Sequence, residues 1–414
     1  MKPKTILSFL VLLISLSLAQ SLQTVHADTA YDVNTPVKKK YKRALVVAGG
    51  GFQTAIFLGI IEGALKSPNP PDVIVATCGG SVAAAITNAF PNVEDRRKFL
   101  VEDYYESFRD VKLENNGFRY LIKSFFRVLG AAKSGVKEKI PPIFEDYMVN
   151  IPIDPKIMPK LNIPFNPQGI PIIIIAGELD PEFGPDHVGE LRRGRKLVTQ
   201  TFFTDPMTAT LLEGFESPVA YPESTVRKET KTIIDKTLVQ ASRASISDFY
   251  GTSLQNIDGT FYVTGATDLY AIEVGEYVAD EVIMTYKRPF PKMFQKAMKS
   301  VFRYDSNKRL KEVNAKDAAY WIDITDTNTT LAKEEFGPAI NWLTWKVNLR
   351  MAKTFEEYDA RVTKLWNYGE ERAWEALNFS VRNWKCHVRE RNKGNTDFNH
   401  PSVKSEPCPV KKQK

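Results

Sequence analysis

Two short stretches decide the fold of this chain: residues 44–55 read ALVVAGGGFQTA, and residues 73–83 read VIVATCGGSVA. In each stretch a continuous apolar run is followed by glycines and then by a helical pattern. Continuous apolar runs of this length are typical of strands that are buried on both faces of a parallel sheet. We therefore expect strands 44–48 and 73–77 to be adjacent and parallel, each leading through a glycine-rich turn into a helix.

Further apolar runs extend the same pattern. Residues 171–176 and 197–203 are predicted strands, and helical segments lie between the strands. This alternation predicts an α/β fold with a mainly parallel central sheet flanked by helices. From about residue 290 the pattern becomes helical and rich in Lys, Glu and Trp, and it ends in a long predicted helix at 358–377. The sequence thus predicts a core and a helical C-terminal extension.

The N-terminus has the parts of a secretory signal. Two lysines, Lys2 and Lys4, precede an apolar run from 6 to 18, and a small-residue exit ends at Ala27. The run is shorter than the ~20 residues that span a bilayer. We expect cleavage after this leader and export to the periplasm or the extracellular space, with retention as an anchor as the alternative.

The net charge and the numbers of histidines and cysteines limit the kinds of partner, ligand and disulfide that we expect. Lys and Arg outnumber Asp and Glu by 56 to 49, a mild excess that suits weak attraction to an anionic lipid surface and gives no reason to expect nucleic acid binding. None of the four histidines shares a metal-ligand spacing with another, so we expect no metal and no cofactor. In an exported protein Cys386 and Cys408 are expected to pair, which leaves Cys78 as a buried free thiol.

The first glycine turn, Gly49-Gly50-Gly51, is a candidate oxyanion site. Consecutive glycines let backbone N–H groups face outward, and the helix that follows adds the positive end of its dipole. Such a turn can stabilise a phosphate or the oxyanion of an acyl-transfer intermediate. It is no dinucleotide fingerprint, because Thr54 stands where that motif has its last small residue, and it lacks the Lys-Ser/Thr ending of a P-loop.

The second turn contains a candidate nucleophile. Gly79, Ser81 and Ala83 fit a Gly-x-Ser-x-Gly motif with Ala in the last place. In such an elbow the serine lies on a sharp strand-to-helix turn, with its hydroxyl above the sheet. The motif therefore predicts Ser81 as the nucleophile of an acyl hydrolase. The alternative is a plain helix N-cap at Ser81.

Together the two turns resemble the patatin-like phospholipase family. Its members carry a glycine-rich oxyanion loop, a serine elbow, an Arg-Ala-Ser segment and a later Asp-Gly motif, which supplies the aspartate of a Ser–Asp dyad. Here RAS is found at 243–245 and FYVTGA at 261–266, and the YG of 368–369, followed by Ala373 and Trp374, is similar to the end of the family's last long helix. The resemblance implies a lipid acyl hydrolase of phospholipase A or esterase type, acting on lipid or other ester substrates.

The chain departs from the family pattern at the residue that serves as the general base. Thr264 stands at the position of the dyad aspartate, and a threonine hydroxyl is no general base at neutral pH. Asp268, four residues later, is a candidate substitute base. Asp258 precedes the same strand and is expected at its other end. The alternative to an active hydrolase is therefore a catalytically inactive protein that binds lipid or protein through the same cleft.

These observations predict the organisation of the whole chain. A signal peptide covers 1–27, a linker 28–42, the acyl-hydrolase core 43–285, the helical extension 286–380 and a basic tail 381–414. Peripheral membrane contact is expected from the basic C-terminal region.

Overall fold

The computed structural model describes most of the chain between Lys40 and Leu377. The residues outside this description are 1–39, 51–52, 110–113, 116–122, 124–125, 127–129, 131–137, 146, 148, 151–157, 287–288, 291, 317, 332, 335, 337, 342–345, 350–351 and 378–414. The signal peptide, most of the predicted linker, the basic tail and the Cys386–Cys408 pair all lie outside the described residues and remain predictions.

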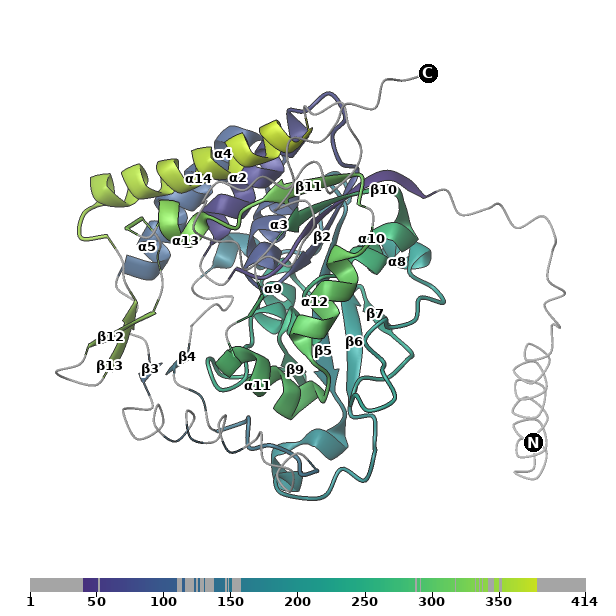
Figure 1. Cartoon of the computed structure of the whole chain (residues 1–414). Helices are drawn as coiled ribbons and strands as arrows, with labels where there is room; N and C mark the ends of the chain where they lie inside the picture. Colours follow the sequence, from purple (N-terminus) through teal and green to yellow (C-terminus); the bar gives the residue numbers. More distant parts are fainter. Residues whose placement is uncertain are drawn as a thin grey trace, which may run out of the picture. The chain divides into compact units, whose positions relative to one another are not determined.

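A mainly parallel sheet forms the centre of the unit that begins at Lys40 (Figure 1). In the described part its order is β11-β10-β1-β2-β5-β6-β7. Strands β11 to β5 run parallel, β6 is antiparallel to β5, and a β8–β9 hairpin pairs with β5 through β9. The strands are β1 (Tyr41–Val47), β2 (Val73–Thr77), β5 (Ile172–Leu179), β6 (Val198–Phe203), β7 (Lys231–Ile233), β8 (Gln255–Ile257), β9 (Thr260–Val263), β10 (Ala279–Tyr286) and β11 (Tyr320–Asp323).

The predicted neighbours β1 and β2 are paired in parallel, with Ala44 opposite Val73 and Val47 opposite Ala76. The structure confirms this prediction and the α/β class. Because the two strands point the same way, their glycine turns emerge at the same edge of the sheet. That edge is where the candidate residues of the two motifs meet.

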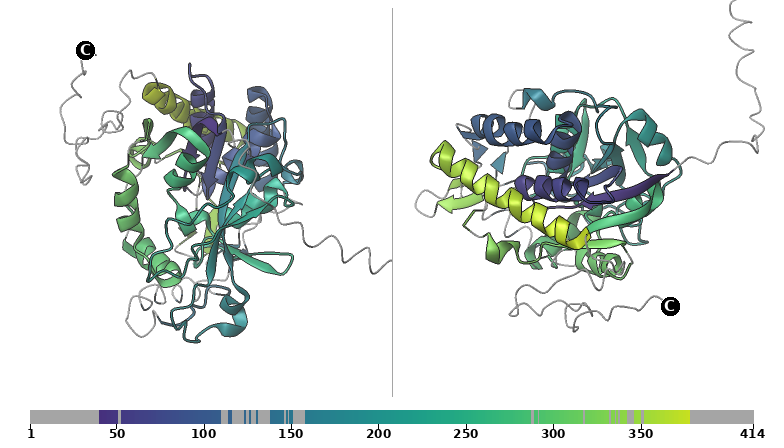
Figure 2. Two further views of the ribbon diagram at one scale, coloured as in Figure 1. Left: turned by 90° about the vertical axis from the view of Figure 1, so that its right-hand side faces the viewer. Right: turned by 90° about the horizontal axis from the view of Figure 1, so that it is seen from above.

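Helices cover both faces of the sheet (Figure 2). Alternate residues of β1 enter opposite cores: Leu45 and Val47 pack on one side, Ala44 and Val46 on the other. The first core includes α2 (Thr54–Leu65), α3 (Gly79–Ala89), α9 (Leu238–Ser245) and α14 (Phe355–Leu377). The second includes α10 (Ile272–Val278), α11 (Lys292–Phe302) and α12 (Ser306–Asn314). The shorter helices are α4 (Val93–Lys98), α5 (Tyr104–Arg109), α8 (Pro206–Leu211) and α13 (Thr327–Thr330).

Within the described residues, two small strand pairs lie outside the central sheet. They are β3 (Glu114–Asn115) with β4 (Val149–Asn150), and β12 (Pro338–Asn341) with β13 (Lys346–Leu349).

The helical C-terminal region is present and is joined closely to the core. Strand β11 from this region forms the edge of the central sheet next to β10. Helix α14 crosses α2 at a contact made by glycines. A Cβ at Gly59 would lie 2.0 Å from the carbonyl oxygen of Trp366, and one at Gly369 would lie 2.1 Å from that of Ile56. Only glycine allows the two backbones to approach so closely.

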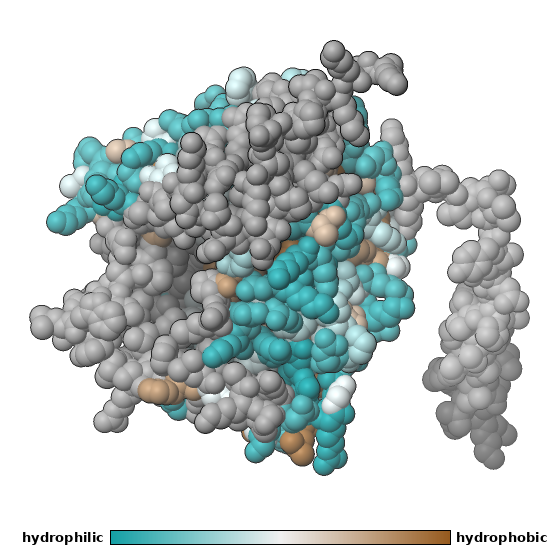
Figure 3. Space-filling model, in the orientation of Figure 1, coloured by the Kyte–Doolittle hydropathy of each residue, from teal (hydrophilic) through white to brown (hydrophobic). Residues whose placement is uncertain are grey.

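No helix among the described residues is long and apolar enough to cross a membrane. On the face shown in Figure 3, the described surface is mainly hydrophilic, with small, separate hydrophobic spots.

Candidate active site

A strained turn joins β2 to α3 at Cys78. Strand β2 ends at Thr77 and α3 begins at Gly79, so Cys78 is the single connecting residue and the N-cap of α3. Its backbone has φ 52° and ψ −128°. Non-glycine residues rarely adopt such positive φ values, and strain of this kind is concentrated at functional sites. Cys78 carries a thiol and is 7% exposed. The strand-to-helix elbow of this fold is therefore at Cys78.

The structure places Ser81 inside α3 and not on the elbow. Helix α3 begins at Gly79, because the glycines after the strand continue directly into helical geometry. Ser81 is fully buried, and its hydroxyl donates a hydrogen bond of 2.6 Å to the carbonyl oxygen of Cys78. Ala83 is likewise buried within the helix. This geometry does not favour Ser81 as nucleophile, and the alternative of an N-cap at Ser81 is wrong because Cys78 takes that position.

The elbow motif fits the sequence three residues earlier than expected. Read from Ala76 to Gly80, the turn is Ala-Thr-Cys-Gly-Gly, with Cys78 in the central place. Small flanking residues are needed because strand and helix approach closely. A Cβ at Gly80 would lie 2.5 Å from the carbonyl oxygen of Val47. The signal in the sequence was the end of the apolar run at Thr77, since the nucleophile of an elbow follows its strand directly.

The first glycine turn lies against this elbow. The N–H of Gly49 donates to both the carbonyl and the hydroxyl oxygen of Thr77, each over 3.1 Å, and the N–H of Gly80 donates to the carbonyl of Gly49 over 3.3 Å. The prediction that Gly49 is an oxyanion donor is therefore wrong, because its N–H is used to join the two turns. Gly50 has φ 97°, which favours glycine. Gly51 lies outside the described residues, and its role stays a prediction.

Gly79 is better placed than Gly49 to stabilise an oxyanion. As the first residue of α3, its N–H has no acceptor within the helix. An elbow typically uses the N–H of the residue after the nucleophile, together with an N–H from the loop after a neighbouring strand. Gly79 and the glycine turn after β1 match these two sources.

Ser245 holds the elbow in place. Its hydroxyl oxygen accepts a 2.8 Å hydrogen bond from the N–H of Cys78 and donates a 2.6 Å bond to the carbonyl of Ile175 on β5. Ser245 is the last residue of α9 and is completely buried. The serine of the Arg-Ala-Ser segment thus has a structural role beside the strained residue.

Thr264 lies near the same elbow, at the end of β9. Its hydroxyl donates to the carbonyl of Ser245 over 3.2 Å and accepts from the N–H of Ala266 over 3.1 Å. A Cβ at the next residue, Gly265, would lie 2.7 Å from Ser245 Oγ and 3.0 Å from Thr77 Cβ. The loop that begins at Thr264 therefore packs directly against the residues that form and hold the elbow.

Asp248 is a residue near the site to which the sequence patterns gave no role. The backbone N–H of Thr264 donates to the carbonyl of Ser247, the residue before Asp248, over 3.0 Å, and burial raises the pKa of the Asp248 carboxyl group to about 6. Asp248 follows α9, three residues after Ser245. It was missed because only the tertiary contact between this loop and the end of β9 brings it to the site.

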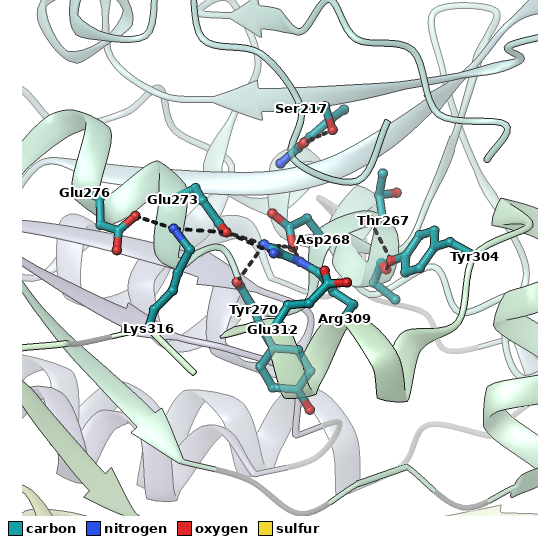
Figure 4. Close-up of polar contacts among 12 residues, drawn as sticks. Ser217, Thr267, Asp268, Tyr270, Glu273, Glu276, Tyr304, Arg309, Glu312 and Lys316 are labelled. Atoms are coloured by element: carbon teal, nitrogen blue, oxygen red, sulfur yellow. Dashed lines mark hydrogen bonds and ion pairs between the residues drawn. The ribbon is translucent and has the colours of Figure 1, made fainter. Parts of the chain in front are cut away.

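Asp268 is held in a buried ion pair with Arg309 (Figure 4). Its Oδ1 accepts from Arg309 Nη2 at 3.3 Å, and Arg309 also pairs with Glu273. Burial raises the pKa of Asp268, and the charge of Arg309 opposes that rise. In the same region the Tyr304 hydroxyl contacts the carbonyls of Ala266 and Thr267 at 3.1 and 2.9 Å. These contacts assign Asp268 to fixing the loop after β9 to α12.

Among the described residues, no group of three or more His, Cys, Asp and Glu side chains is arranged to hold a metal ion.

Fold and site together define an α/β protein with a strand-to-helix elbow of the hydrolase type. The chain belongs to the patatin-like phospholipase family, whose model matches residues 45–267, more than half of the chain. Patatin-like phospholipases act on lipid and ester substrates. Among solved structures, VipD from Legionella pneumophila is similar at 11% sequence identity and a TM-score of 0.31, over 81% of this chain and 67% of that one. No curated protein matches the chain.

Proposed function

We propose that the chain is a lipid acyl hydrolase in which the thiol of Cys78 is the nucleophile. The observation that carries the proposal is the strained backbone of Cys78 on the turn between β2 and α3. Membership of the patatin-like phospholipase family supports an ester substrate with a fatty acyl group. Cysteine is a competent nucleophile for acyl transfer, because its thiolate is accessible nearer neutral pH than a serine alkoxide.

The reaction would proceed in two steps. The sulfur of Cys78 attacks the ester carbonyl carbon, a C–S bond forms, and the oxyanion is stabilised by the N–H of Gly79 and by the glycine turn after β1. The C–O bond to the alcohol then breaks, and the alcohol leaves with a proton. Water attacks the thioester, which releases the fatty acid and regenerates the thiol.

The test compares variants at the two candidate nucleophiles. Hydrolysis of p-nitrophenyl butyrate is measured in a background in which Cys386 and Cys408 are serine, so that Cys78 is the single thiol. We expect Cys78→Ala to lose roughly a hundredfold or more in kcat/KM, and Ser81→Ala to keep activity within about threefold, given that its hydroxyl is buried in α3. Mass spectrometry of the quenched reaction should find the acyl group on Cys78. Full activity in Cys78→Ala, together with loss of activity in Ser81→Ala, would show that Ser81 is the nucleophile and Cys78 is not.

A second candidate function is lipid binding without turnover. Thr264 favours it, because the family's dyad carboxylate is absent from that position. This function predicts saturable binding of a fatty acyl ligand with no acylated Cys78 at any pH. Appearance of the thioester in the same mass spectra would exclude it.

A further inference from the structure

A long loop joins β5 to β6 and extends beyond the edge of the sheet at which the elbow lies. Strand β5 pairs in parallel with β2, and Ile175 is opposite Thr77, the residue before the elbow. From there β5 continues to Leu179, a further distance of about 13 Å at ~3.3 Å per residue. The loop of residues 180–197 therefore projects past the elbow, and it forms the lower end of the unit in Figure 1.

A buried arginine fixes this loop to the body of the protein. The guanidinium of Arg192 donates to the carbonyl oxygens of Lys139 and Val301 over 2.9 and 2.8 Å. The backbone of the loop is also paired, since the N–H of Ile140 donates to the carbonyl of Glu190 over 2.9 Å. These contacts hold the loop in one shape, in which it cannot fold back onto the core.

The loop presents two apolar side chains to solvent. Val188 is 38% exposed and Leu191 is 50% exposed. In the described part of the chain, no other loop between two elements carries two large hydrophobic side chains that are this exposed. Single exposed hydrophobic residues are common, whereas a group of them indicates a surface that contacts a partner. Since the loop is fixed in place, the group stays available to such a partner.

The unpaired charge around this apolar group is mainly positive. Arg193 follows the group directly, Lys139 is paired with Leu191 in an isolated β-bridge, and Lys299 lies in the last turn of α11, to whose carbonyls the loop is bound. The side chains of these three cations are exposed, and none has a carboxylate partner among the described residues. The carboxylates of the described loop are paired with arginines, except that of Asp186.

We propose that this loop docks the protein on an anionic lipid bilayer, with Val188 and Leu191 inserted among the acyl chains and the three cations against lipid phosphates. The choice of lipid as the partner rests on the function proposed above, because a lipid acyl hydrolase must meet its substrate in a bilayer or a micelle. A loop that projects past the elbow at the same edge turns the elbow toward that surface. Aliphatic side chains and unpaired cations together match both layers of an anionic lipid interface.

The test measures co-sedimentation with sucrose-loaded vesicles of phosphatidylcholine and phosphatidylglycerol in a molar ratio of about three to one. The protein is the chain from residue 28, the predicted form after cleavage, because the apolar run 6–18 would itself bind lipid. The compact unit begins only at Lys40, so this form contains all of it. Wild-type binding should weaken in pure phosphatidylcholine and at high salt, which screens the charges.

Two sets of substitutions separate the apolar and the charged contributions. Val188→Ser/Leu191→Ser should lower the partition coefficient roughly tenfold or more, because both side chains lose their apolar surface. Lys139→Gln/Arg193→Gln/Lys299→Gln should lower it by roughly fivefold for each cation that contacts the surface. All five side chains are exposed, so we expect the Tm of both variants to stay close to that of the wild type.

Met207→Ser/Ile234→Ser is the matched control. These hydrophobic residues are 66% and 49% exposed, and they follow β6 and β7, which run antiparallel to β5 and end at the opposite edge of the sheet. We expect the control to bind vesicles as the wild type does. An equal loss in the control and the loop variants would mean non-specific adsorption and would overturn the docking surface, as would unchanged binding in both loop variants.

The assay also distinguishes lipid from a second copy of the chain. If the loop variants change the oligomeric state in sedimentation velocity without lipid, and the vesicle binding stays the same, the loop is an interface between copies and the lipid assignment is wrong.

This proposal and the proposed nucleophile fail in different ways. Vesicle binding does not depend on turnover, so its loss in the loop variants supports the docking surface even if Cys78→Ala hydrolyses p-nitrophenyl butyrate as fast as the wild type. That second result would refute only the nucleophile. An acylated Cys78, together with vesicle binding that the loop substitutions leave unchanged, would refute only the docking surface.

Discussion

The hydroxyl of Ser245 binds the backbone of Cys78: Ser245 Oγ accepts the N–H of Cys78 over 2.8 Å while it donates to Ile175 on β5 over 2.6 Å. One buried side chain thus fixes the strained residue to the neighbouring strand. The elbow needs this support because a non-glycine residue at positive φ costs roughly 1–3 kcal/mol.

Ser245→Ala should therefore lower activity more than its small change in volume suggests. The substitution removes the hydroxyl that accepts from the N–H of Cys78 and donates to the carbonyl of Ile175, and losing buried hydrogen bonds of this kind costs about 1–3 kcal/mol. We expect a lower Tm and a fall of roughly tenfold or more in the rate of Cys78 acylation. Ser253→Ala, on the nearby loop, is the control. Equal acylation rates in Ser245→Ala and the wild type would show that the elbow needs no such support.

The family's dyad can be rebuilt in this fold. Cys78→Ser alone should reduce ester hydrolysis roughly tenfold or more, because a serine hydroxyl is a far weaker acid than a thiol. Thr264→Asp should then raise the activity of Cys78→Ser by at least about tenfold. An aspartate at 264 can also accept from the N–H of Ala266, as Thr264 now does.

This rebuilding works best with Asp248→Asn, because two adjacent carboxylates raise each other's pKa. The measurement is kcat/KM for p-nitrophenyl butyrate in Cys78→Ser, with and without the other two changes. An inactive triple variant that is still folded would show that serine cannot use this elbow.

The crossing of α2 and α14 should be intolerant of any side chain. Alanine in place of glycine normally stabilises a helix by about 1 kcal/mol. At Gly369, however, a Cβ would lie 2.1 Å from the carbonyl oxygen of Ile56, so the helices must move apart. We expect Gly369→Ala to lower the free energy of unfolding by roughly 1–3 kcal/mol. Glu371→Ala, on an exposed position of α14, should change it little, and denaturant titration distinguishes the two.

Asp323 should make the stability of the fold depend on pH. This residue ends β11 and is 5% exposed, and its Oδ2 has no hydrogen-bond partner among the described residues. Burial raises its pKa to about 6 from 3.8. The protonated form is thus favoured in the folded state, so the free energy of unfolding falls as pH rises from about 4 to about 6 and stays lower above that.

Asp323→Asn should remove the destabilisation that the ionised carboxylate of Asp323 causes at higher pH. We expect the variant to be more stable than the wild type by about 1–3 kcal/mol at pH 8 and equal to it near pH 4. Chemical unfolding at both pH values measures the difference. A variant that is destabilised equally at both would mean that the carboxylate is needed in its charged form.

The sequence by itself determined the class of the fold and the two turns that form the site. Continuous apolar runs at 44–48 and 73–77 are sufficient to predict adjacent buried strands, because strands buried on both faces need apolar side chains at every position. The glycines then identify the edge of the sheet where chemistry is expected. The resemblance to the family, which also rests on short local motifs, placed Thr264 at the position of the dyad aspartate.

Tertiary structure alone decided which residues meet at that edge. A Ser-centred motif and a Cys-centred motif overlap in residues 76–83, and only the backbone angles of Cys78 show which residue is on the turn. Asp248 and Ser245 reach the site because α9 packs against the ends of β5 and β9, a contact between segments far apart in the chain. Asp268 pairs with Arg309 of α12, 41 residues later, and no local pattern of the sequence indicates that contact. Local patterns specify strands, helices and turns, whereas the pairing of charges and hydroxyls depends on long-range packing.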